Sequence, residues 1–171
     1  SNIARMMQRA TAGAAGAGLD VDEVFSTYLY DGNNTGQSIV NGIDLSGEGG
    51  LVWTKARDYT VDHALVDTVR GNTKFVQSNS ADDEETTSVG ITAFNSTGYT
   101  LGADNTWKFN VSNSYVSEYV SWTFRKAPKF FDVVKYNGTG STQNISHNLG
   151  VVPAMIMVKG FDSQSDSVRW N

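Results

Sequence analysis

The fold class is indicated most clearly by residues 116–125, Val-Ser-Glu-Tyr-Val-Ser-Trp-Thr-Phe-Arg. Its side chains alternate in character with a period of two, and residues 50–56, Gly-Leu-Val-Trp-Thr-Lys-Ala, alternate in the same way. A period of two places successive side chains on opposite faces of a strand. The pattern therefore predicts strands with one buried and one solvated face, as in an antiparallel sandwich.

Further stretches on either side also have the composition of strands, and turns rich in Gly, Asn and Asp separate them. Strands about 8–12 residues apart with such turns are typical of a β-sandwich or jelly roll. We therefore predict a mainly β protein, an antiparallel β-sandwich or jelly-roll-like domain with a short N-terminal α-helix. The predicted strands are residues 24–30, 36–41, 50–56, 62–68, 73–78, 90–95, 98–102, 116–125, 129–136, 142–147, 154–160 and 167–170.

The first 22 residues differ from the rest of the chain. Apolar residues recur at helical spacing within residues 2–12, and Ala-Gly-Ala-Ala-Gly-Ala-Gly follows at 12–18. So short a helix is marginal alone in water, and a Gly/Ala tract cannot pack a core. Residues 1–22 are therefore predicted to form an anchor helix and a tether, although a frayed terminus is the alternative. The predicted contact residues of the anchor, toward sister chains or another protein, are Ile3, Arg5, Met6, Met7 and Ala10.

An internal repeat relates residues 25–58 to residues 131–162. At an offset of 106 the identical pairs are Phe25/Phe131, Tyr30/Tyr136, Gly32/Gly138, Gln37/Gln143 and Ile39/Ile145; at an offset of 104 they are Lys55/Lys159 and Asp58/Asp162. We predict a first β-sandwich unit over 23–128 and the beginning of a second, truncated β unit over 129–171. A fortuitous similarity of strands and turns is the alternative. Tandem β units behind a tether are typical of an extended appendage.

Composition and charge exclude several classes of function. The net charge of −5 disfavours nucleic acid as the main ligand, because phosphate contacts need clustered Lys and Arg. The chain has no cysteine, which excludes disulfides, thiol nucleophiles and cysteine-ligated metals. No apolar run approaches the roughly 20 residues of a membrane span, so we predict no membrane insertion.

The titratable residues indicate no catalytic site. His63 shares an alternating strand with Asp67, but no Gly-x-Ser-x-Gly turn accompanies them, so we expect a hydrogen-bonded structural histidine. His147 takes the place of Asn41 in the repeat, which indicates a turn contact. The acidic residues of 79–88 are typical of a solvated loop. We therefore predict no catalytic residue, no cofactor and no metal site.

The aromatic residues provide the candidates for ligand contact. Trp53 and Trp122 lie mid-strand, where we expect core positions. Trp107 and Phe109 lie in a polar loop, residues 103–114, and are the candidates for contact with a glycan or a protein. The alternative is that they are hydrophobic anchors that pin this long loop to the core.

Several stretches taken together resemble one group of proteins. The most specific is 119–128, Tyr-Val-Ser-Trp-Thr-Phe-Arg-Lys-Ala-Pro, and the others are 4–8, 41–45, 47–58, 67–71, 98–102, 147–150 and 153–159. The ensemble resembles a domain family in virion-associated proteins of marine tailed bacteriophages, often labelled tail-fibre-like and otherwise uncharacterised. The resemblance implies a place in the phage particle, in a tail appendage, and it implies no reaction.

We therefore expect a non-enzymatic structural component of a phage tail appendage, a tail fibre or fibre-like protein. Its N-terminal segment would dock on a tail, baseplate or adaptor protein of the virion, with assembly in the host cytoplasm. Phage fibres are commonly homotrimers, so we expect a trimer around residues 2–10. The rival hypothesis is a glycan-binding, jelly-roll lectin-like module that contacts the host surface through loops 79–88 and 103–114. A third class of function, a depolymerase, would need two carboxylates across a cleft.

Overall fold

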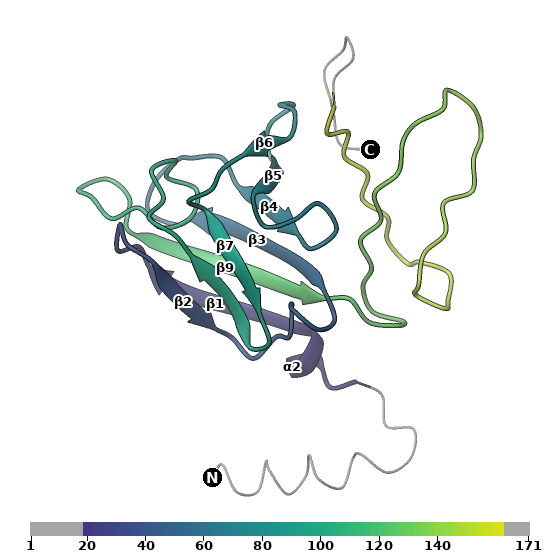
Figure 1. Ribbon diagram of the computed structural model, residues 1–171, viewed down its shortest axis with the longest axis horizontal. Coiled ribbons are helices and arrows are strands. Elements are labelled where there is room, and N and C mark those ends of the chain that lie inside the picture. The colour runs from purple at the N-terminus through teal and green to yellow at the C-terminus, as the bar shows by residue number, and fades with distance from the viewer. Residues whose placement is uncertain (1–18, 163–171) are drawn as a thin grey trace, which may run out of the picture.

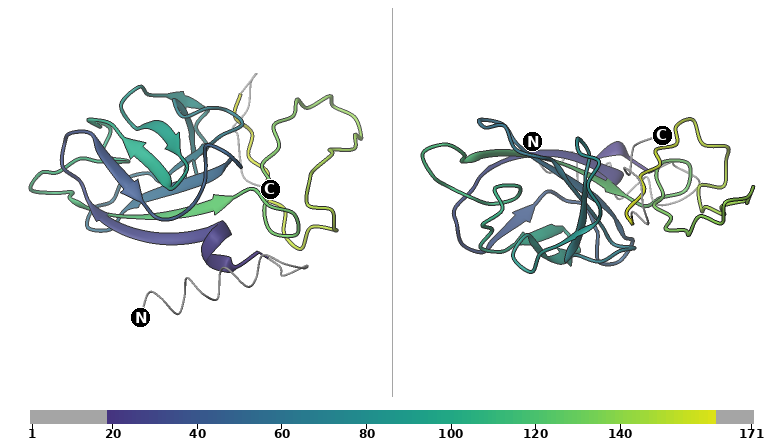
Figure 2. Two further views of the ribbon diagram at one scale, coloured as in Figure 1. Left: turned by 60° about the horizontal axis from the view of Figure 1, so that its bottom comes forward. Right: turned by 90° about the horizontal axis from the view of Figure 1, so that it is seen from above.

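A computed structural model describes residues 19–162, in which two antiparallel sheets face each other (Figures 1 and 2). The six-stranded sheet has the order β1 (Phe25–Asp31), β9 (Glu118–Arg125), β3 (Gly50–Ala56), β4 (Ala64–Asp67), β5 (Lys74–Gln77) and β6 (Glu85–Thr86). The three-stranded sheet has the order β2 (Gln37–Val40), β8 (Gly98–Leu101) and β7 (Ile91–Asn95). The sheets do not close into a barrel, and the predicted mainly β, antiparallel sandwich is confirmed.

The eight strands predicted between residues 24 and 125 all form, and their ends agree with the prediction within two residues. The two-residue strand β6 lies inside the predicted loop 79–88. The strands predicted at 129–136, 142–147 and 154–160 are wrong, because the structure contains no strand after β9 within the described residues. The stretch 167–170 lies outside those residues.

A short helix, α2 (Val21–Val24), leads directly into β1, and its last residue is buried. It overlaps the last two residues of the predicted N-terminal segment 1–22, whereas the predicted anchor helix and the Gly/Ala tract 12–18 lie outside the described residues. Between residues 19 and 162, no helix is long and apolar enough to cross a membrane.

The strand β9 holds the larger sheet together. It pairs in antiparallel register with β1 from Phe25↔Phe124 to Asp31↔Glu118, and with β3 from Gly50↔Arg125 to Ala56↔Tyr119. Consequently β1 and β3 do not touch each other through backbone hydrogen bonds, although they are the outer neighbours of one strand. The last strand of the described residues is thus indispensable to the first and the third.

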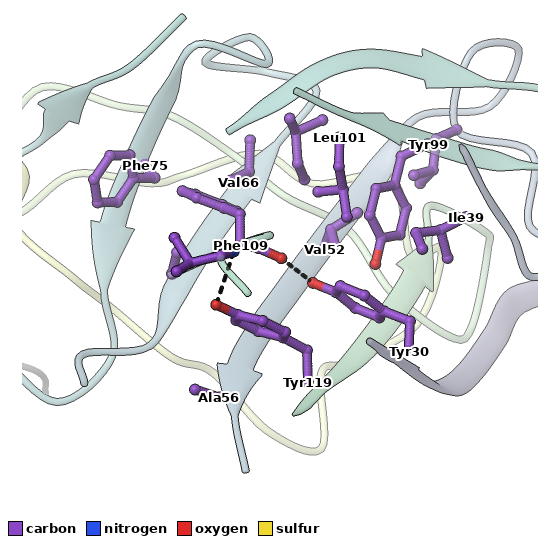
Figure 3. Packing of buried hydrophobic residues seen from close by; sticks show 14 of the residues in the cluster. Tyr30, Ile39, Val52, Ala56, Val66, Phe75, Tyr99, Leu101, Phe109 and Tyr119 are labelled. Carbon is purple, nitrogen blue, oxygen red and sulfur yellow. Dashed lines mark hydrogen bonds between the residues drawn. The ribbon is translucent and has the colours of Figure 1, made fainter. Parts of the chain in front are cut away.

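The core lies between the two sheets and combines aliphatic with aromatic side chains (Figure 3). Tyr30 and Tyr119 stack with ring centroids 5.3 Å apart, and the Tyr30 hydroxyl donates to the carbonyl of Phe109 at 2.7 Å. The Phe109 ring meets Phe75 edge to face at 5.6 Å. Because the hydroxyl of Tyr30 is removed from water, burial raises its pKa well above its ordinary value.

Residues 129–162 lie beside one end of the sandwich, beyond the C-terminal end of β9 (Figure 1). A hydrogen bond from the first unit recurs in them at the offset of 106. Gln37 Nε2 donates to the carbonyl of Asp31 at 2.8 Å, and Gln143 Nε2 donates to the carbonyl of Asn137 at 3.1 Å.

A second contact recurs at the same offset. Asn41 Oδ1 accepts from the amide of Ile43 at 3.2 Å, and His147 Nδ1 accepts from the amide of Leu149 at 3.3 Å. The two side chains differ, but both bond the amide two residues further on. The turn contact expected for His147 is therefore present.

The turn between these contacts also has the same unusual backbone. The φ angle is +59° at Asn34 and +70° at Gly140, which is the residue 106 positions later. Asparagine and glycine are the residues that most readily adopt this left-handed conformation. Three local features thus support the internal repeat over 31–43 and 137–149, while the division of the chain after residue 128 stays a prediction.

Candidate functional site: an aromatic cluster on the loops

Three aromatic side chains from two loops meet at the surface, and we name Tyr59, Trp107 and Tyr115 the aromatic cluster. Tyr59 lies in the loop between β3 and β4, and Trp107 and Tyr115 lie in the loop between β8 and β9. The ring of Tyr59 meets Trp107 edge to face at 5.4 Å, and it lies 6.1 Å from the ring of Tyr115. Tyr59 is 41% exposed and Tyr115 is 64% exposed, whereas Trp107 is half-buried against the core. The cluster therefore has an inner tryptophan and two outer tyrosines.

The buried carboxylate of Asp104 shapes the loop that carries Trp107. Asp104 Oδ1 accepts from the amide and hydroxyl of Thr106, at 2.8 and 2.7 Å. Asp104 Oδ2 accepts from the amides of Phe109 and Asn110, at 2.9 and 3.2 Å. The loop winds around this side chain, and Trp107 has a φ of +66°, which is uncommon for a bulky residue. The surrounding bonds hold it in this strained conformation.

The same loop is joined to β9 by Tyr119. Its hydroxyl donates to the carbonyl of Trp107 at 3.2 Å and accepts from the amide of Val111 at 3.1 Å. Burial raises the pKa of Tyr119, so the hydroxyl stays protonated and able to donate at neutral pH. The position of Trp107 is thus determined by a core residue.

Asp58 holds the loop of Tyr59 in place. Its Oδ2 atom accepts from the amide and hydroxyl of Ser117, at 2.8 and 3.1 Å, and from the amide of Glu118 at 3.1 Å. Desolvation alone would raise the pKa of Asp58, but the donated hydrogen bonds outweigh it and the pKa is lowered. The ionised carboxylate therefore connects the loop to the start of β9.

Asn113 caps the last part of the β8–β9 loop in a similar way. Its Oδ1 atom accepts from the amides of Tyr115 and Val116, at 2.8 and 2.9 Å. Local bonds of this kind give each of the three rings a defined position before any ligand arrives. A preformed aromatic surface can stack on the C–H faces of a sugar ring, while the tyrosine hydroxyls bond sugar hydroxyls.

One of the two predicted ligand contacts is wrong. Phe109 is completely buried in the core, so it cannot touch a ligand at the surface. It is the loop anchor that we considered as the alternative. Trp107 is the candidate that the structure keeps near the surface. Sequence reasoning missed Tyr59 and Tyr115, although both are aromatic residues in polar loops, which is the signal that selected Trp107.

The mid-strand tryptophans lie outside the core. Trp53 and Trp122 are half-buried on the outer face of the six-stranded sheet, with ring centroids 5.6 Å apart. His63 adjoins Trp53 at 6.4 Å, and its Nδ1 lies 3.2 Å from Ser78 Oγ. Burial, followed by the nearby Lys55, lowers the pKa of His63. These contacts agree with a structural histidine.

Of the other sequence predictions, the anchor cannot be compared with the structure and the solvated acidic loop is wrong in part. The proposed anchor residues Ile3, Arg5, Met6, Met7 and Ala10 lie outside the described residues. Glu84, from the acidic loop 79–88, is not solvated as expected, because it pairs with the largely buried Arg70 at 3.4 Å and with Lys74 at 2.9 Å. Within residues 19–162, no three acidic or histidine side chains are placed to share a metal ion.

The fold and the site together define an antiparallel β-sandwich whose loops present an ordered aromatic cluster. The chain belongs to the family described as "Domain of unknown function (DUF7483)", whose model matches residues 20–171. No curated protein and no solved structure matches the chain. Since the family description names neither an activity nor a source, the resemblance to phage tail-fibre-like proteins stays a prediction.

Proposed function

We propose that the protein is a non-enzymatic structural component of a phage tail appendage, a tail fibre or fibre-like protein of the virion. The N-terminal segment docks on a tail, baseplate or adaptor protein, the chain forms a homotrimer, and β modules project toward the host. The observation that supports this proposal is the recurrence of one turn geometry, with its two side-chain contacts, 106 residues apart. A chain built from successive copies of one unit grows in length, as an appendage requires.

A deletion tests the docking role. A chain without residues 1–11 should fold normally, because these residues precede every described strand, and it should be missing from assembled particles. Normal incorporation of the shortened chain would contradict the proposal. Sedimentation of the full chain tests the trimer: replacing Met6 and Met7 by Asp should give monomers, while replacing both by Leu should preserve the trimer.

A second candidate function is glycan binding by the aromatic cluster, as in a lectin-like module that contacts host surface carbohydrate. The exposed ring of Tyr59, placed against Trp107, and the exposed ring of Tyr115 beside Tyr59 support it. The loops hold these rings through Asp58, Asp104 and Asn113, so little ordering cost remains for binding. A protein partner with a flat apolar patch is the competing ligand.

A glycan array with the full chain tests this second candidate. Tyr115→Ala should lose binding without loss of stability, since the side chain is largely exposed. Tyr136→Ala is the matched control, because Tyr136 is also exposed but lies in residues 129–162. Binding that survives both Tyr59→Ala and Tyr115→Ala, or that Tyr136→Ala weakens equally, would rule out the cluster as the sugar site.

A further inference from the structure

The absence of strands between residues 129 and 162 has a topological explanation. At the offset of 106, residues 131–137 correspond to β1, and at the offset of 104, residues 154–160 correspond to β3. In the first unit these two strands never pair with each other, because each pairs with β9. Nothing in residues 129–162 corresponds to β9. Two strand-forming segments without their common neighbour form no strand within the described residues.

The exposure of the side chains also indicates that the two segments lack a neighbouring strand. Positions that form the core of the first unit have apolar but exposed counterparts in the second. Tyr30 is 9% exposed and Tyr136 is 39% exposed; Ile39 is 3% exposed and Ile145 is 37% exposed. The contrast is largest in the β3 counterpart, where Val52 is fully buried and Ile156 is 71% exposed.

The exposed apolar residues are concentrated in one short stretch. Within residues 151–157 the side chains of Val152, Met155, Ile156 and Met157 are all more than half exposed, and Val152 is 90% exposed. Contiguous exposed apolar surface of this kind marks an interaction site. Residues 154–157 align with the first half of β3 at the offset of 104, which indicates a partner that adds as a strand.

We propose that residues 131–160 are an acceptor site for a β-strand of the β9 kind. The occupant is a polypeptide segment with the residue pattern of 64–125, whose β9-like strand lies antiparallel between 131–137 and 154–160. It completes a second sandwich. This inference does not depend on a role in the virion, because it follows from strand order and burial alone.

The described part of a second copy of this chain cannot be the occupant. Its β9 already has both edges occupied, by β1 and by β3, so it has no free backbone donors and acceptors to offer. Nor does a copy of residues 131–160 fit, since it supplies the flanking segments again and not the strand between them. The site therefore requires a β9-like strand that is not already paired.

The register of the first unit specifies how the occupant lies. Tyr30 is opposite Tyr119, and Trp53 is opposite Trp122. The corresponding acceptor positions are Tyr136, which should face a residue like Tyr119, and Met157, which should face a residue like Trp122. Main-chain hydrogen bonds would supply affinity, and these side-chain pairs would supply register.

A chimaera supplies the missing strands in one chain. Residues 1–162 are followed by residues 59–128, because residue 163 corresponds to residue 59 at the offset of 104. Amide hydrogen exchange is measured for 131–137 and 154–160 in the chimaera and in the original chain. Exchange should slow at least about 100-fold in both segments, since a ladder that opens only with the sandwich protects its amides.

The control is the same chimaera with Ser121→Pro in the appended copy, which removes a ladder donor from the centre of the new strand and should restore fast exchange. Fast exchange in the unaltered chimaera, with the first unit still protected, would overturn the inference. So would protection of these segments in the original chain that increases with its concentration, because the occupant would then be a second copy.

Discussion

Replacing Asp104 by alanine should destabilise the sandwich more than any surface substitution. The carboxylate satisfies two buried amides, those of Phe109 and Asn110, and two partly buried donors of Thr106. A buried donor left without a partner costs about 1–3 kcal/mol, so the two buried amides together cost about 4 kcal/mol. The Thr106 donors lie where water can replace the lost acceptor, and we assign them no further cost.

The assay is urea and thermal unfolding of the full chain, followed by tryptophan fluorescence. A loss of about 4 kcal/mol should lower Tm by about 16 °C in a domain of this size. Asp104→Asn keeps one acceptor oxygen, so it should lower the free energy of unfolding by about half as much as Asp104→Ala does. Asp20→Ala is the matched control, since Asp20 is exposed and its side chain makes no capping hydrogen bond. A loss below about 1 kcal/mol for Asp104→Ala would refute the reasoning.

Three further predictions concern other parts of the sandwich. Gly50→Ala should prevent folding, because its Cβ would lie 2.1 Å from a β9 carbonyl oxygen, whereas Gly138→Ala, with open space around it, should unfold in urea like the unaltered chain. Arg70→Met should cost about 3–5 kcal/mol in urea unfolding, since it leaves the buried Asp67 carboxylate without its cation. Because the pKa of Asp58 is lowered in the folded state, its carboxylate stabilises the fold above the ordinary pKa of 3.8, and this stabilisation is lost as the pH falls through the lower folded value. Asp58→Asn should therefore make the free energy of unfolding less sensitive to acid. An unchanged pH profile of unfolding would contradict this.

The strands of the first unit were predictable because their pattern is local. In β3, buried and half-buried residues alternate without exception from Gly50 to Ala56, as the period of two requires. Turns rich in Gly, Asn and Asp then determined where each strand ends. Such signals depend only on neighbours in the sequence.

Which face of β9 is buried was not predictable in the same way. Its hydroxyl side chains Ser121 and Thr123 are fully buried toward the core, while Trp122 and Phe124 are half-buried on the outer face. Ser121 lies beside the buried Tyr99, and Asn41 Nδ2 donates to Thr123 Oγ1 at 2.8 Å. The partners that make this arrangement favourable come from distant strands and loops.

The outer face of β9 is covered by unexpected neighbours. The ring centroid of Phe124 lies 5.0 Å from that of Phe25 and 5.2 Å from that of Phe131. Aromatic residues that precede and that follow β9 in the sequence therefore cover this face. The alternation of apolar and polar residues predicts which face is buried only when the other face is solvated. In β9 both faces are covered, so the alternation does not identify the face toward the core. The tryptophans were placed in the core for this reason.

The aromatic cluster was only partly visible in the sequence. Trp107 was found because an aromatic residue in a polar loop is unusual, but Phe109 satisfied the same criterion and is a core residue. The difference between them is set by Asp104, which turns the backbone so that one ring is directed inward. Only the hydrogen bonds of the loop distinguish the two positions.

The central place of β9 connects these observations. A strand of this fold is defined by its neighbours in the sheet, and for β1 that neighbour arrives about 90 residues later in the chain. The sheet therefore cannot form until its last strand is present. Residues 131–160 have the patterns of β1 and β3 and even their turn contacts, yet they form no strand within the described structure. Local pattern is thus sufficient to specify a turn and insufficient to specify a strand, and the partner that completes the ladder decides the outcome.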